Sequence, residues 1–151
     1  MDEKTQMKHL LLLTAFLVSC ITCNAQVSIS SSMLVGTKWL HVNQVSENKA
    51  FKFHYAFTKR NMTSQQEGRS RVHSYTYYLT DKIPQSYDKS KVGKPSKGCY
   101  LVEYSEKRED MTYYTIKSFN RKTGKMELYW EYDGKTIGGS SCTLEFTRLR
   151  K

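Results

Sequence analysis

Histidine and cysteine are the side chains in this 151-residue sequence best suited to bind metals or to act as bases and nucleophiles. Beyond position 25 they are His41, His54, His73, Cys99 and Cys142. The histidines lack the short spacing of a metal site, and the cysteines lack the close partner cysteines of a structural zinc site. A Gly-x-Ser-x-Gly nucleophile elbow is also absent. We therefore expect a noncatalytic protein with no metal site and no cofactor.

An apolar run at residues 10–21 bears on the cellular compartment of these cysteines. It is shorter than the roughly 20 residues that span a bilayer, but it suits the apolar region of a secretory signal. We expect a signal peptide over residues 1–25, cleaved before Gln26, with lipidation at Cys20 as the alternative. The predicted location is the exterior or the bacterial cell envelope, either periplasmic or associated with the outer membrane.

Export places the two remaining cysteines in an oxidising compartment. One disulfide between Cys99 and Cys142 is therefore predicted, and it would close a loop of about 44 residues. Two buried free thiols in different strands are the alternative, because two cysteines alone do not define a disulfide framework.

The elements that must position any site are short strands. Aromatic and aliphatic residues alternate with polar ones at period two, and no amphipathic helix pattern occurs after the signal. A flexible, serine-rich lead-in is expected over residues 26–33, followed by one domain over residues 34–151. Its predicted strands lie at residues 37–43, 51–57, 69–79, 100–104, 111–119, 126–132 and 140–149. This spacing predicts an all-β protein, an antiparallel up-and-down barrel of about eight strands.

The charge of the chain favours anionic partners. Residues 1–25 hold two cations and two anions, so the remainder keeps the net charge of +10. Both prolines and several lysines fall in the predicted long loop, which gives a basic segment at residues 82–97. Such a loop suits an acidic glycan or an acidic protein surface. Nucleic acid is not an expected partner of an exported protein, and a membrane is expected only through a lipid at Cys20.

The first predicted strand resembles the opening of lipocalins. Residues 34–39 read Leu-Val-Gly-Thr-Lys-Trp, and Arg148 stands near the end of the last strand. The resemblance implies an eight-stranded barrel that Trp39 plugs at one end, with Gly36 before the strand and Arg148 packed over the indole. With export and size, it points to the small lipocalin-like secreted proteins of Gram-negative bacteria.

Two functions are compatible with these observations. The first is a binding protein that holds a small amphipathic or lipidic ligand in the barrel mouth. Its expected lining is the aromatic and aliphatic set Phe53, Tyr55, Phe57, Tyr113, Leu128 and Trp130. The second is an envelope interaction module that binds a protein or glycan through the basic loop 82–97 and has a filled barrel centre.

Overall fold

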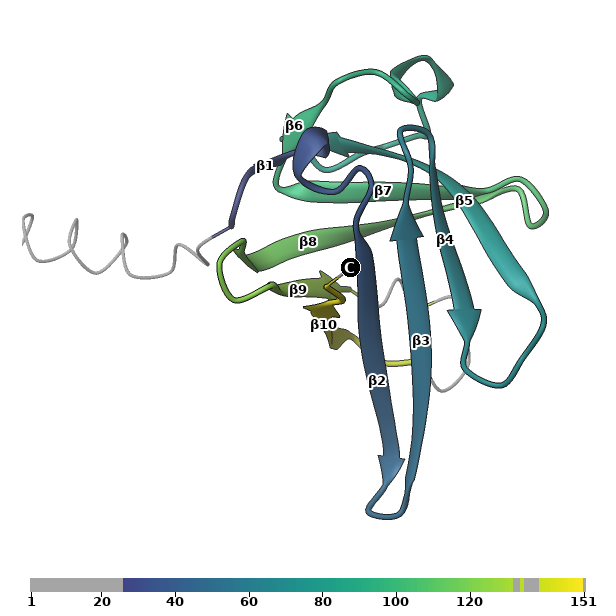
Figure 1. The fold of residues 1–151 in the computed structure, drawn as a ribbon. Helices are drawn as coiled ribbons and strands as arrows, with labels where there is room; N and C mark the ends of the chain where they lie inside the picture. The colour runs from purple at the N-terminus through teal and green to yellow at the C-terminus, as the bar shows by residue number, and fades with distance from the viewer. Residues whose placement is uncertain (1–25, 132–133, 135–138, 151) are drawn as a thin grey trace, which may run out of the picture.

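The computed structural model describes residues 26–131, 134 and 139–150 (Figure 1). The predicted signal peptide and Cys20 lie outside the described residues. Eight antiparallel strands close into a barrel in the order β10-β2-β3-β4-β5-β7-β8-β9, which confirms the predicted fold class. The strands are β2 (Lys38–Ser46), β3 (Lys49–Phe57), β4 (Asn61–Gln66), β5 (Val72–Thr80), β7 (Tyr100–Ser105), β8 (Asp110–Asn120), β9 (Lys125–Trp130) and β10 (Cys142–Arg148).

The segment before the barrel is fixed to it, so the prediction of a flexible lead-in over residues 26–33 was wrong. It contains β1 (Ile29–Ser30) and the 3-10 helix η1 (Ser31–Met33), and β1 pairs with the short strand β6 (Lys97–Gly98). Ile29 is buried in the barrel core, and the Val27 N–H donates to the Ile116 carbonyl at 3.0 Å. One apolar anchor and paired backbone groups thus order a serine-rich sequence.

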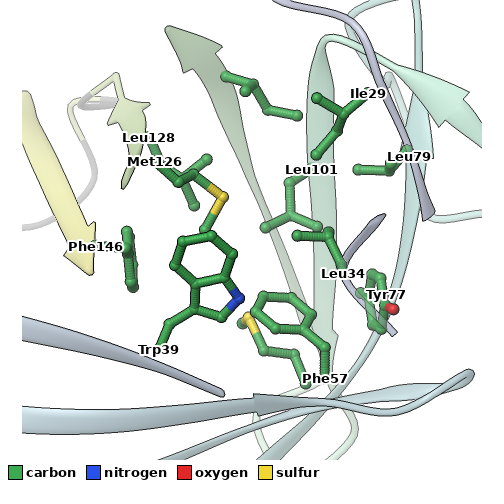
Figure 2. Packing of buried hydrophobic residues seen from close by; sticks show 12 residues of the cluster. Ile29, Leu34, Trp39, Phe57, Tyr77, Leu79, Leu101, Met126, Leu128 and Phe146 are labelled. Atoms are coloured by element: carbon green, nitrogen blue, oxygen red, sulfur yellow. The ribbon is translucent and has the colours of Figure 1, made fainter. Parts of the chain in front are cut away.

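The core fills one end of the barrel, which we call the closed end. The indole of Trp39 lies among Phe57, Met126 and Phe146 (Figure 2) and is only 1% exposed. Leu34, which follows η1, joins this cluster. Burying these large side chains is the main stabilising contribution of the fold.

The residues of the lipocalin-like opening lie together at the closed end. Gly36 has φ +75°, which favours glycine, and its N–H donates to the Phe57 carbonyl at 2.8 Å. The Trp39 Nε1–H donates to Thr37 Oγ1 at 2.7 Å. Arg148 is the register partner of Trp39 across the β10–β2 pair, and its side chain is exposed.

The segment between β5 and β7 packs on the outside of the barrel wall. It contains the short 3-10 helix η2 (Lys89–Lys91), which Asp88 caps by accepting the Ser90 N–H at 3.0 Å. Tyr87 and Val92 of this segment pack against Tyr78 and neighbouring residues on the outer face. The basic loop 82–97 is therefore a structured cover over β5, β7 and β8.

The two cysteines do not form the predicted disulfide. Both are free, Cys99 buried and Cys142 exposed at the start of β10. The Cys99 Sγ–H donates to the Gln26 side chain at 3.3 Å, beside the N-terminal segment. Cys99 directly precedes β7, whereas Cys142 opens β10, and the structure shows no bond between the two sulfur atoms. Among the described residues, no helix has the length and apolar character needed to cross a bilayer.

Candidate ligand site in the polar half of the barrel

Beyond the core, the barrel interior becomes polar. Inward positions are identified by register, because directly opposed residues of neighbouring strands face the same side of the sheet. Glu103 lies opposite the core residue Tyr77, and Tyr114 lies opposite the core residue Leu101. The same relation to core residues places further polar side chains inside, namely His41, Tyr55, Ser64 and Tyr75. We call this region the polar half.

Glu103 is the central residue of the polar half. Its side chain is buried, with 6% of the residue exposed, and Oε1 accepts a hydrogen bond from the Tyr114 hydroxyl at 3.1 Å. Burial raises the pKa of this carboxyl to about 7, although the Tyr114 hydrogen bond and the nearby Arg108 charge oppose the shift. Glu103 therefore changes charge near neutral pH.

The phenols around Glu103 remain protonated. Burial, with the Glu103 charge and Tyr75 as smaller causes, raises the pKa of Tyr55 to about 12. Burial and the Glu103 charge also raise the pKa of Tyr114 well above its usual value. These groups can donate hydrogen bonds at any physiological pH. The site thus combines one carboxyl that can ionise with hydroxyls that do not.

A cation lies at the edge of this region, on the turn between β7 and β8. The Arg108 guanidinium carbon is 5.8 Å from the centre of the Tyr75 ring. Its Nε–H is shared between the two Asp110 oxygens, each at 3.1 Å. Asp110 largely neutralises this guanidinium, so it does not supply Glu103 with a full counter-charge.

The histidines do not assemble into a site. His41 Nδ1–H donates to the Glu145 carbonyl at 2.9 Å, and its ring lies 5.3 Å from that of Phe146. His54 is exposed and pairs with Glu67 at 3.3 Å, whereas His73 is exposed near the start of β5. No group of three or more His, Cys, Asp or Glu side chains in the described ranges is arranged to hold a metal ion.

Three of the six residues expected to line a ligand site are half-buried on the inward face beyond the core. Phe53 lies opposite His41, Tyr55 lies opposite Trp39, and Trp130 follows the inward residue Leu128 at period two. Two others, Phe57 and Leu128, are 3% and 2% exposed and belong to the packed core.

Tyr113 is on the wrong face for the predicted role. It packs in the outer cluster with Tyr78 and Val102. A bulge between Ile116 and Ser118 shifts the register of β8 against β9. Ile116 and Phe119 therefore both contribute to the core, although residues three apart on a regular strand face opposite sides. Counting back from Phe119 in steps of two therefore selects the outer face at Tyr113.

Four residues of the polar half were not identified from the sequence: Ser64, Tyr75, Glu103 and Tyr114. A signal for Glu103 does exist, since it is the one acidic residue within the otherwise uncharged stretch of residues 98–105. A carboxyl inside such a strand is rarely buried without a partner or a role.

Comparison of the chain with protein-family models, with curated proteins and with solved structures finds no match.

Proposed function

We propose that this chain is an exported, noncatalytic, lipocalin-like binding protein that holds a small amphipathic ligand in the polar half of the barrel. The observation that carries the proposal is the hydrogen-bonded pair of Glu103 and Tyr114, buried inside an aromatic barrel. A buried carboxyl is costly for a merely structural interior. A ligand that supplies a positive charge or a further hydrogen-bond donor to the carboxylate would offset this cost.

The surrounding side chains favour a particular ligand chemistry. Phe53, Tyr55 and Trp130 offer ring surface to an apolar body, because each is inward-facing and half-buried. The ionised Glu103 carboxylate accepts hydrogen bonds and repels anions, so it suits a donor group, best of all a protonated amine. The ligand class is therefore an apolar molecule with an amine or hydroxyl end, not a carboxylate.

The test is displacement of a fluorescent hydrophobic probe by dodecylamine, dodecanol and dodecanoate. We expect the amine to bind best and the acid worst, and we expect amine affinity to rise as pH increases through about 7, where Glu103 ionises. The variant Glu103→Gln should weaken amine binding about 10- to 100-fold, the range for a hydrogen bond to a charged group, and change dodecanol binding little.

Glu145→Gln is the matched control for that experiment. Glu145 is exposed on β10, and its contact with His41 uses the backbone carbonyl, which the substitution retains. Equal effects of the two substitutions, or preferred binding of dodecanoate, would contradict the proposed ligand chemistry.

The alternative interaction module at loop 82–97 has less support. Lys91 lies 3.9 Å from Asp88 and stands over the Tyr78 ring at 5.4 Å, so part of the charge of the loop is already partnered. The other face of the loop is used for packing on the barrel.

Export also belongs to the proposal. It is tested by the intact mass of the mature protein purified from its host. A mass beginning at Gln26 supports ordinary cleavage, and a diacylglyceryl adduct beginning at Cys20 supports the lipoprotein alternative. A mass that includes residues 1–25 would contradict both.

A further inference from the structure

The closed end of the barrel has a second feature, unrelated to the polar half. A hollow of about 740 Å³ lies between the start of β2, the β8–β9 turn and the end of β10. Five cationic side chains line it: Lys38, Arg121, Lys122, Arg148 and Arg150. We call this hollow the basic cleft. An adjoining hollow of about 340 Å³ shares Thr37, Arg121 and Arg148 with it.

The backbone that carries these cations is well held. The Asn120 side chain accepts the N–H groups of Lys122 and Thr123, each at 3.0 Å, which fixes the β8–β9 turn. The Arg148 N–H donates to the Gly124 carbonyl at 2.7 Å and ties this turn to β10. A Cβ at Gly124 would lie 3.0 Å from that of Arg148, so the two segments are in close contact. The cations are thus brought together by the fold.

The described residues supply the basic cleft with no compensating charge. None of their carboxylates lines either hollow. Within the described part of the chain, the four ion pairs lie elsewhere and involve none of these five cations. Like charges held close together repel one another, which is a cost unless an anion binds between them. Arginine guanidinium groups match phosphate oxygens in a bidentate geometry.

The rim of the adjoining hollow is apolar. Met33 of η1 and Val35 line it beside Arg121 and Arg148, and they are 40% and 41% exposed. Exposed apolar side chains next to clustered cations are typical of surfaces that bind both the acyl boundary and the headgroups of a bilayer. A soluble anion would use the charges but not Met33 or Val35.

We infer that the basic cleft and its apolar rim form a docking surface for an anionic membrane, with lipid phosphates in the cleft. The surface lies at the closed end, where β2 begins and β10 ends, whereas Glu103 lies in the half of the barrel beyond the core. Docking in this orientation leaves the polar half directed away from the bilayer. The inference is independent of the proposed ligand.

The experiment is co-sedimentation of the protein that comprises residues 26–151 with phosphatidylcholine vesicles that contain one third phosphatidylglycerol. We expect binding that weakens as salt is raised, and none to pure phosphatidylcholine. Arg121→Gln with Lys122→Gln should reduce partitioning about 25-fold, since each basic residue at a membrane surface contributes about fivefold. Met33→Ser should reduce it several-fold and leave the salt dependence unchanged.

The matched control is Lys82→Gln with Lys89→Gln, which removes the same charge from the exposed loop 82–97. Circular dichroism confirms that each variant is folded. An equal loss in the control, or equal binding to neutral vesicles, would overturn the inference. So would displacement from vesicles by millimolar glycerol phosphate, which indicates a small-anion site, or tighter cleft-dependent binding to heparin, which indicates a glycan partner.

Discussion

The Glu103 carboxyl couples the stability of the barrel to pH through its burial. Its ordinary pKa is 4.5, and in the folded protein it is raised to about 7. Between these two values the folded chain keeps a proton that the unfolded chain has released. The free energy of unfolding therefore decreases as pH rises from about 4.5, and the loss is complete above about 7. A difference of this size corresponds to about 3 kcal/mol.

Glu103→Gln should remove this dependence, because the amide keeps the shape and the hydrogen bond from Tyr114 but has no charge. We expect the variant to match the parent protein near pH 4.5 and to be more stable by up to about 3 kcal/mol near pH 8. Urea denaturation at a series of pH values measures the difference. Glu145→Gln should show no such divergence, and parallel curves for Glu103→Gln and the parent would refute the assignment.

At the scale of elements, the sequence predicts strands whose two faces differ. Phe53, Tyr55 and Phe57 of β3 alternate with polar residues because one face packs inward and the other meets solvent. The strand β4 was not identified, since its inward positions pass from Met62 to Ser64 and so from core to polar half. Alternation disappears wherever the inward face is itself polar.

The same reasoning explains why the site was only partly predicted. Nearly all of β7 is buried, because loop 82–97 covers its outer face while the barrel encloses the inner one. A strand buried on both sides shows no period of two, so Glu103 could not be assigned to the interior. Tyr113 was misplaced by the β8 bulge, a local insertion that has no signature in the pattern of residue types.

The small sheet formed by β1 and β6 depends on Gly98. A Cβ at this position would lie 2.0 Å from the backbone carbonyl atoms of Thr80, which cannot move without distorting β5. We expect Gly98→Ala to lower the stability of the protein by about 1–3 kcal/mol, the usual cost of overpacking. Chemical denaturation measures this loss. Lys97→Ala, at the exposed neighbouring position, should cost little, and equal stabilities of the two variants would contradict the account.

At the scale of the whole molecule, the barrel is closed by its shortest seam. The register of β10 with β2 comprises three residue pairs, whereas β10 has six with β9 and β2 has eight with β3. Beyond these pairs, the Leu149 N–H donates to the Lys38 carbonyl at 2.9 Å and extends the seam toward the basic cleft. A closed sheet opens most readily where the fewest paired groups must separate.

Hydrogen exchange should therefore begin at this seam. The Leu149 amide is expected to exchange through a local opening that is insensitive to low denaturant. The Ile116 amide, which donates to the Cys99 carbonyl at 2.8 Å beside the core, should exchange only with global unfolding and should respond steeply to denaturant. Native-state exchange followed by NMR distinguishes the two regimes. If the Leu149 amide is protected as strongly as that of Ile116, the β10–β2 contact is not the weak point. Closure must then be held by the inward packing of Trp39 and Phe146 rather than by the few paired backbone groups.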